Sequence, residues 1–380
     1  MAKKDKDKEV NESEEGGNWV QQRIAGLAKD PRFKGSDFND MDVADWRVST
    51  GSLKLDSALS TDGKEGIGPQ IVKIYGPFGA GKTSFLLNIA RNFQKLGPNH
   101  FVFVVNAEGR ITDKLLEQAG IDKNPAQFHM EHNQQAEAVF SKIRILMMEN
   151  NQKPKKDYTY FCVLIDSMDA LIKKEDSMKI DEAGFDSNLR VGGNAVISKT
   201  FLKSASLPIT AGKHLLLLTG QVITNINASK NQKKTQASGG VGAQYFSSTM
   251  LEVKKAWTNT KIWDGDKEIG HYFELFIEKT ANNQKAGDTV MIPIKRDFLP
   301  EKAVWKEVEV KDLLLEWGWI KKAGQGRFEI SESYAKELID NKVSFEEKFH
   351  GESKIVTHLE ENQPLLDYSV GKLRKALFSE

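Results

Sequence analysis

Residues 76–83, GPFGAGKT, match the pattern G-x-x-x-x-G-K-[ST] of a loop that binds phosphate groups. The glycines let the backbone bend so that successive N–H groups face an anion. Lys82 would bring a mobile positive charge to the β- and γ-phosphates, and the Thr83 hydroxyl would ligate Mg²⁺. The sequence therefore predicts a site for ATP and Mg²⁺, whose loop consists of Gly76, Pro77, Phe78, Gly79, Ala80, Gly81, Lys82, Thr83 and Ser84.

Two acidic residues follow apolar runs. Asp166 closes YFCVLID, which places a carboxylate at the edge of the sheet where the phosphate loop also lies. Its expected role is to hold Mg²⁺, although an aspartate after a strand is also a common helix cap. Glu108 follows FVFVV and could activate the water that attacks the γ-phosphate. On position alone, Glu108 would be an ordinary surface glutamate by default.

Short apolar runs and amphipathic segments alternate after Gly68, which predicts an α/β fold with a mostly parallel central sheet. The predicted buried strands are residues 70–75, 101–105, 160–165 and 215–218, and the predicted helices are residues 83–96, 134–149 and 189–207. Residues 249–253 and 272–279 look like further strands, which we expect to be antiparallel and to extend one edge. After about residue 300 the pattern becomes rich in Trp and Lys, which indicates a small C-terminal α/β domain.

The composition is that of a soluble intracellular protein. Among 380 residues the formal net charge is +1, which neither supports nor excludes a local basic groove for nucleic acid. Cys162 is the single cysteine, so a disulfide within the chain is excluded, in keeping with a reducing cytoplasm. No apolar run approaches the ~20 residues of a membrane span. We therefore expect a cytoplasmic protein without a membrane partner.

The first residues are polar and charged, which predicts a disordered tail over residues 1–16. Residues 19–27 have apolar side chains at helical spacing. Such a short helix packs either on its own core or on a neighbouring subunit, and the sequence leaves both open. The predicted organisation is a tail (1–16), an N-terminal helix and linker for subunit docking (17–49), an ATPase core (50–300) and a small C-terminal domain (301–380).

The ordered motifs resemble the RecA family of homologous-recombination proteins, with similarity to its phage as well as its bacterial members. TGSLKLDSAL and IVKIYGPFGAGKTS look like the opening of the RecA core, and VVNAEGR resembles the segment with the family's catalytic glutamate, at Glu108. VLIDSMDALIKK resembles the strand that ends in the Mg²⁺-binding aspartate, at Asp166. LLLLTGQV places Gln221 where the family senses the γ-phosphate.

The resemblance also implies DNA-binding loops. One would follow Gln221 over residues 222–245 and is too long and polar for a simple connection. Ile226 falls where the family inserts an aliphatic side chain between base triplets. Without the resemblance, this loop would read as a disordered surface insertion. That loop corresponds to the family's second DNA loop, and the first is expected near residues 179–189. The residues expected to contact DNA are Arg190, Lys199, Ile226, Lys230, Lys233, Lys234, Gly239 and Gly240.

Two further positions correspond to subunit contacts in the family. Lys279 falls on a lysine that completes the ATP site of the next subunit, and Tyr245 falls on an aromatic that relays the ATP state. A plain core or loop aromatic is an equally good interpretation of Tyr245. The chain departs from the family at Ala281, the second lysine position, and at Thr112 and Leu115, where the family contacts adenine.

The resemblance predicts an ATP-dependent recombinase that forms a helical filament on single-stranded DNA and exchanges strands with homologous double-stranded DNA. DNA-stimulated hydrolysis would rely on Glu108, Lys82 and Gln221, and single-strand-binding and mediator proteins are expected partners. The alternatives are a RecA-like helicase motor, a non-catalytic recombination mediator and a metabolic P-loop kinase. A mediator would lack the carboxylate of Glu108, and a kinase would not need the long polar loop.

Overall fold

The computed structural model describes residues 46–60, 62–183, 193–224, 235–254, 260–281, 285–296 and 302–378. Residues 44–380 form one compact unit by their internal contacts. Five of the residues expected to contact DNA lie outside the described residues, as do the predicted tail and N-terminal helix; these five are Arg190, Ile226, Lys230, Lys233 and Lys234.

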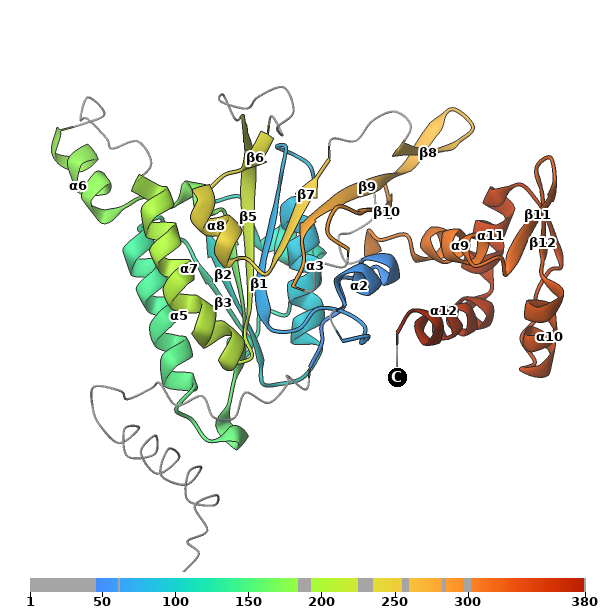
Figure 1. Ribbon diagram of the computed structural model, residues 1–380, viewed down its shortest axis with the longest axis horizontal. Helices are drawn as coiled ribbons and strands as arrows, with labels where there is room; N and C mark the ends of the chain where they lie inside the picture. Colours follow the sequence, from blue (N-terminus) through green and yellow to red (C-terminus); the bar gives the residue numbers. More distant parts are fainter. Residues whose placement is uncertain are drawn as a thin grey trace, which may run out of the picture. The chain divides into compact units, whose positions relative to one another are not determined.

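A central sheet organises the described core (Figure 1). The strand order is β10-β9-β7-β1-β5-β4-β2-β3, with β6 added beside β5 and β8 beside β9. The strands are β1 (Gln70–Gly76), β2 (His100–Asn106), β3 (Phe128–Glu131), β4 (Tyr160–Asp166), β5 (Leu215–Thr224), β6 (Thr235–Ala237), β7 (Thr249–Val253), β8 (Lys261–Asp264), β9 (Lys267–Lys279) and β10 (Thr289–Lys295). The six strands from β7 to β3 in this order are parallel, so the predicted α/β class with a mostly parallel sheet is confirmed.

One strand direction differs from the sequence prediction. Residues 249–253 were expected to be antiparallel, but β7 pairs in parallel with β1, with Val72 opposite Thr249. The reason is that α8 (Gly240–Phe246) returns the chain to the starting edge of the sheet before β7 begins. Antiparallel pairing begins one strand later, where β9 runs against β7 and β10 against β9.

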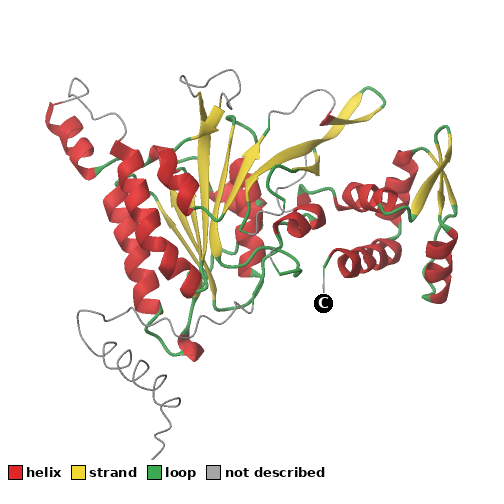
Figure 2. Ribbon diagram, in the orientation of Figure 1, coloured by secondary structure: helices red, strands yellow, loops and turns green. Residues whose placement is uncertain are grey.

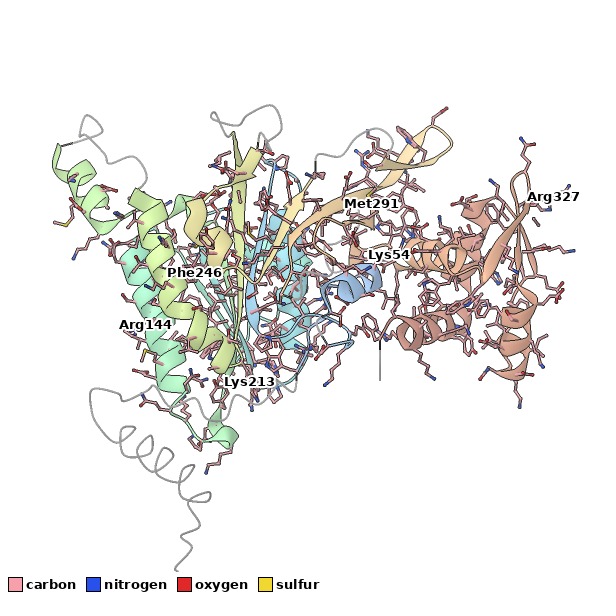
Figure 3. The ribbon with its side chains drawn as sticks, viewed as in Figure 1. Lys54, Arg144, Lys213, Phe246, Met291 and Arg327 are labelled. Carbon is pink, nitrogen blue, oxygen red and sulfur yellow. The ribbon has the colours of Figure 1, made fainter. Side chains whose placement is uncertain are left out.

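Helices cover both faces of this sheet (Figure 2). On one face, α2 (Leu53–Leu59) contributes Leu55, and α3 (Lys82–Gln94) contributes Leu86 and Phe93, to a large apolar core. On the other face, α5 (Ala136–Asn150) and α7 (Gly193–Ala211) pack with α8 over a second core. Lys54 in α2 and Phe246 at the end of α8 mark the two sides in Figure 3. The sheet is therefore buried on both faces, which explains its continuously apolar strands.

Shorter helices lie in the connections between the strands and the longer helices of the core. They are α4 (Asp113–Gln118), α6 (Lys174–Ala183) and the 3₁₀ turns η2 (Lys155–Asp157) and η3 (Met168–Ala170). Thr112 caps α4, because its hydroxyl oxygen accepts the N–H of Leu115 at 3.2 Å. No helix among the described residues is long and apolar enough to cross a membrane.

The C-terminal segment has an apolar core of its own, which includes Tyr334 and Leu373. It contains α9 (Lys306–Glu316), β11 (Ile320–Gly324), β12 (Arg327–Ile330), α10 (Glu332–Asp340), β13 (Lys348–His350), α11 (Glu352–Glu361) and α12 (Gln363–Leu377). The three strands form a separate antiparallel sheet.

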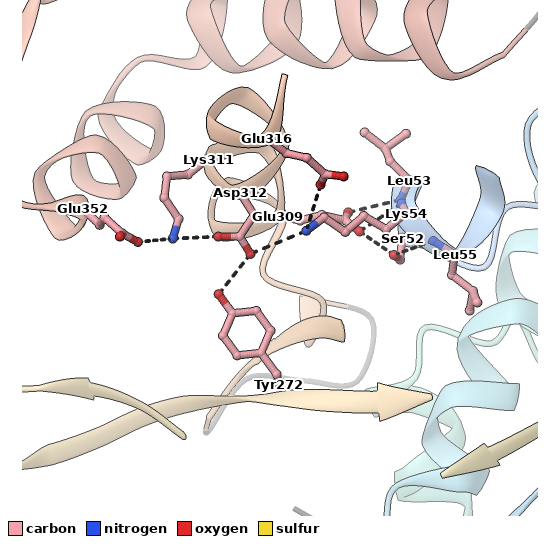
Figure 4. A network of polar contacts seen from close by, with 10 residues as sticks. All are labelled: Ser52, Leu53, Lys54, Leu55, Tyr272, Glu309, Lys311, Asp312, Glu316 and Glu352. Carbon is pink, nitrogen blue, oxygen red and sulfur yellow. Dashed lines mark hydrogen bonds and ion pairs between the residues drawn. The ribbon is translucent and has the colours of Figure 1, made fainter. Parts of the chain in front are cut away.

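A polar network joins α9 to α2 and to β9 of the central sheet (Figure 4). The buried carboxylate of Glu309 accepts the N–H groups of Leu53 at 3.2 Å and Lys54 at 3.3 Å, and the hydroxyl of Ser52. Beside it, the hydroxyl of Tyr272 donates to Asp312 at 3.0 Å. Glu309 thus serves as a cap for α2 that comes from a distant part of the chain.

The boundaries expected at residues 49 and 300 stay predictions. Trp46 and Val48, which were assigned to the linker, are buried in the core around α3.

Candidate functional site

The loop between β1 and α3 is held open by glycines in left-handed conformations. Gly79 has φ 70° and Gly81 has φ 81°, which side chains with a Cβ rarely adopt. Gly76 is needed for a different reason, because a Cβ there would lie 2.7 Å from the Cβ of Val253 in β7. α3 then begins at Lys82, so its first N–H groups, which have no partner within the helix, point toward the loop. This is the geometry of an anion site at a helix N-terminus.

Lys82 folds back over the loop. Its ammonium group donates to the carbonyl oxygens of Pro77 at 2.7 Å and Gly76 at 3.0 Å. Burial lowers the pKa of Lys82, while the nearby negative charges of Asp166 and Glu108 act in the opposite direction. The ammonium is therefore placed at the loop and opposite two carboxylates.

The structure brings Thr83 and Asp166 together. The Thr83 hydroxyl donates to Oδ2 of Asp166 at 2.8 Å, and the Thr219 hydroxyl donates to Oδ1 at 2.6 Å. Asp166 is buried at the end of β4, between β2 and β5 in the sheet. A hydroxyl and a carboxylate are the hard oxygen donors that Mg²⁺ prefers, and Mg²⁺ commonly takes its remaining ligands from water and substrate phosphates. The residues present therefore fit a nucleotide-bound Mg²⁺ ion.

Both carboxylate oxygens of Glu108 are engaged. Oε1 accepts a hydrogen bond from the hydroxyl of Ser167, and Oε2 lies 2.7 Å from a guanidinium nitrogen of Arg110. Its backbone N–H donates to the carbonyl of Asp166 at 3.2 Å, which ties the end of β2 to the end of β4. The guanidinium of Arg110 also lies over the ring of Phe78, 4.8 Å from its centre. Arg110 therefore links the acidic residue to the phosphate loop.

One pocket of about 290 Å³ collects these groups. It is lined by residues 78–84 together with Glu108, Arg110, Asp166 and Gln221, among others. The sequence predicted each of these except Arg110. The available signal for Arg110 was its basic side chain, two positions after the candidate catalytic residue Glu108. Thr219, which fixes Asp166, had no local signal, because its role depends on the pairing of β4 with β5.

A second pocket, of about 330 Å³, adjoins the first at the phosphate loop, because residues 79–81 and Ser84 line both. It is more apolar and is lined by Phe85, Phe273 and Ile294, with His271 and Tyr272 at its wall. Thr112 and Leu115, which correspond to adenine contacts in the resembled family, line neither pocket.

The described residues expected to bind DNA lie around α8. Gly239 precedes this helix with φ 85°, and Gly240 is its first residue. Lys199 is an exposed residue of α7. Its Cβ packs closely on Gly242 in α8, where an added Cβ would lie 2.5 Å from it. The geometry of a single chain does not test whether Gly239, Gly240 and Lys199 contact DNA. Their role in DNA binding stays a prediction.

Tyr245 and Lys279 meet at the end of α8. The ammonium of Lys279 donates to the carbonyl oxygens of Ser247 at 2.7 Å, Gln244 at 3.0 Å and Tyr245 at 3.2 Å. Burial lowers the pKa of Lys279. The side chain of Tyr245 is 74% exposed. An exposed aromatic beside a lysine is compatible with the expected subunit contact, which stays a prediction.

Comparison with known proteins agrees with this geometry. The model of the RecA N-terminal domain matches residues 34–292. The protein named Protein RecA from Mycoplasma mycoides is 28% identical over 280 residues, which is 73% of this chain and 72% of the relative. The proteins of the same name from Macrococcus caseolyticus and Petrotoga mobilis are each 25% identical, over 87% and 90% of this chain and 82% of each relative. The chain therefore belongs to the RecA family.

Proposed function

We propose that this protein is an ATP-dependent recombinase, which polymerises on single-stranded DNA and exchanges strands with a homologous duplex. The observation that carries the proposal is the convergence of Lys82, Thr83, Asp166 and Glu108 on one pocket at the phosphate loop. Membership of the RecA family supports a recombinase-type function in broad terms. The filament and the strand exchange are the finer parts of the proposal.

The pocket offers each group that hydrolysis of ATP requires. The loop N–H groups and Lys82 would bind the phosphates, and Thr83 with Asp166 would hold Mg²⁺, which neutralises phosphate charge when bound. Glu108 would orient a water molecule and accept its proton. The water oxygen then forms a bond to the γ-phosphorus as the bond to the bridging oxygen breaks, which gives ADP and phosphate. Gln221, at the rim of the same pocket, would respond to the presence of the γ-phosphate.

The base and ribose of the nucleotide would enter the second pocket. It shares the phosphate loop with the first pocket, so a nucleotide bound at the loop can extend into it. Its apolar wall, with Phe85 and Phe273, suits the face of a nucleobase. This assignment accounts for the lack of an acidic and an aromatic residue at Thr112 and Leu115.

The DNA and the neighbouring subunits would act on the region around α8. Gly239, Gly240 and Lys199 border this helix, and the residues expected at its DNA loop precede it. Tyr245 would contact the next subunit, and Lys279 would exchange the carbonyls that it now binds for that subunit's nucleotide. Head-to-tail contacts between subunits would give a helical filament where the rotation from one subunit to the next does not close into a ring. Single-strand-binding and mediator proteins are the expected partners, and the cytoplasm is the expected location.

The test is ATP hydrolysis with and without single-stranded DNA, for the wild type and a Glu108→Gln variant. We expect strong stimulation by DNA and loss of at least about a hundredfold in rate in the variant, because an uncharged amide cannot accept the proton of the attacking water. Glu149→Gln, on the exposed side of α5, is the matched control and should hydrolyse ATP like the wild type. Hydrolysis that does not respond to DNA would contradict the proposal.

Strand exchange between a circular single strand and a homologous linear duplex separates the remaining alternatives. A recombinase forms joint molecules only with homologous DNA, whereas a helicase motor unwinds a duplex regardless of homology. A non-catalytic mediator would bind DNA but show no hydrolysis above that of the Glu108→Gln variant.

A further inference from the structure

A lysine is buried in the middle of the central sheet. Lys73 lies on β1, three residues before the phosphate loop begins, and is 1% exposed. A buried ammonium group is costly unless it is paired and hydrogen-bonded. Its Nζ donates to the backbone carbonyl of Ser238, and the negative charges of Asp169 and Glu278 act on it. This cation is therefore directed at the chain between β6 and α8.

Asp169 also binds Ser238, through its side chain. It follows Asp166 by three residues, and its Oδ2 accepts the hydroxyl of Ser238 at 2.5 Å and the backbone N–H of Gln221 at 3.0 Å. Gln221 and Ser238 are also bonded to each other, through Ser238 N–H to Gln221 carbonyl and Gln221 N–H to Ser238 hydroxyl, both at 2.9 Å. These two residues stand where β5 and β6 begin to pair, and we call them the neck.

Two glycines leave room for this arrangement. A Cβ on Gly220 would lie 2.9 Å from Cε of Lys73 and 2.9 Å from the hydroxyl of Ser238. A Cβ on Gly239 would lie 3.2 Å from Nζ of Lys73, and the φ of +85° at that residue is itself unfavourable for a side chain. A side chain at Gly220 or Gly239 would therefore collide with Lys73 or crowd it, so glycine at both positions makes room for the lysine.

The neck connects two functions of the chain. Gln221 lines the nucleotide pocket, whereas β6 and α8, which flank Ser238, border the region where DNA is expected. Lys73 leads along β1 to the phosphate loop, and Asp169 follows the strand of Asp166. Neither of the two lines the nucleotide pocket. A displacement of β6 must therefore move Ser238, and through these bonds Gln221.

We propose that Lys73 and Asp169 are positioning residues that clamp the neck and so transmit DNA binding at β6 and α8 to Gln221 in the nucleotide pocket. The inference rests on the proposed function, since it concerns the stimulation of hydrolysis by DNA. It predicts that loss of the clamp uncouples the two sites without removing either one.

The experiment uses the full chain and compares Lys73→Met, Asp169→Asn and the double variant with Lys114→Met, a control at an exposed position of α4. The steady-state rate and KM for ATP are measured with and without single-stranded DNA, together with the Kd for a fluorescent ATP analogue and the thermal unfolding midpoint. We expect Lys73→Met to lose about tenfold of the DNA-stimulated rate, while basal rate and Kd change less than about threefold. The double variant should lose little more than either single variant, because both act through one contact.

Asp169→Asn keeps the shape of the carboxylate, so it tests the clamp even where Lys73→Met folds poorly. Full DNA stimulation in a folded single variant would overturn the inference and leave the proposed function intact. A wild-type rate that DNA does not change would overturn both. Equal losses of basal rate, stimulated rate and nucleotide binding would overturn the inference in favour of a merely structural role.

Discussion

The Thr83 hydroxyl donates a 2.8 Å hydrogen bond to Oδ2 of Asp166 and so joins the phosphate loop to the end of β4. The second carboxylate oxygen is occupied by Thr219 from β5, so Asp166 is held from both sides. Thr219 would not itself bind the metal ion, but it orients the carboxylate that would, and outer partners of this kind tune metal affinity.

Asp166→Asn should lower ATP hydrolysis by about 10²-fold or more, because it removes the negative charge that would hold Mg²⁺. The measurement is the hydrolysis rate as a function of Mg²⁺ concentration. Thr83→Ser retains the hydroxyl and serves as the control, with activity close to that of the wild type. A Thr83→Ser variant as inactive as Asp166→Asn would show that the methyl group, rather than the oxygen, matters at this position.

Arg110 should act on the rate of hydrolysis through Glu108. Its guanidinium lies 2.7 Å from Oε2 of Glu108, and its side chain is half exposed. The arginine therefore restrains the carboxylate while it stays accessible to solvent. We expect Arg110→Ala to lower kcat by about three- to tenfold, in the range for loss of a positioning contact, and to change KM less.

Arg110→Lys should restore part of this loss, since a point charge can pair with the carboxylate but lacks the planar stacking on Phe78. An Arg110→Ala variant with an unchanged kcat and a raised KM would instead assign the arginine to nucleotide binding.

The gathering of the phosphate loop, Asp166 and Glu108 in one pocket could be predicted from the sequence because its signals are local. The phosphate loop, Asp166 and Glu108 each follow an apolar run, and the runs became β1, β4 and β2. The parallel direction of β7 could not be predicted, because it depends on where α8 returns the chain.

The clamp on the neck had no local signal either. Lys73 stands in QIVKIY, whose apolar character predicts a buried strand but gives no partner for a lysine within it. Only the approach of the turn at Ser238 and Gly239 to β1 gives this buried lysine its partner. Asp169 likewise became important through a residue 69 positions away in the chain.

The cap that Glu309 provides to α2 should contribute substantially to stability. Its carboxylate is buried and accepts three donors from residues 52–54 (Figure 4). Burial raises the pKa of Glu309, and the three hydrogen bonds oppose this. Glu309→Ala should lower the free energy of unfolding by about 2–3 kcal/mol, because it leaves buried donors without partners. Urea unfolding measures this, with Glu316→Ala at an exposed position of the same helix as the control. Equal stability of the two variants would contradict the assignment.

Asp56 should make stability depend on pH. Burial raises its pKa from 3.8 to about 7, although the hydroxyls of Ser49 and Thr50 and the Thr50 N–H donate to the carboxylate. Between these pH values the folded chain keeps a proton that the unfolded chain has lost, so the free energy of unfolding falls as pH rises from about 4 to about 7. Asp56→Asn removes this dependence, so its stability relative to the wild type should rise by up to about 4 kcal/mol across that interval. Urea unfolding at pH 4, 5.5 and 7.5 measures the difference, and a difference that does not change with pH would exclude the buried carboxyl as its source.

Lys73 should produce the opposite trend at alkaline pH. Burial lowers its pKa from 10.5 to about 8, while the facing charges of Asp169 and Glu278 raise it. Between about pH 8 and 10.5 the unfolded chain binds a proton that the folded chain does not, so this group makes the free energy of unfolding rise with pH.

The stability of the wild type relative to Lys73→Met should therefore increase by up to about 3 kcal/mol over that window, since Met cannot titrate. Tryptophan fluorescence during urea unfolding at pH 7.5, 9 and 10 follows the change, and subtraction of the variant removes the titration of other lysines and tyrosines. A difference that stays constant from pH 7.5 to 10 would mean that the Lys73 ammonium keeps its proton throughout, held by Asp169 and Glu278 more firmly than its burial opposes.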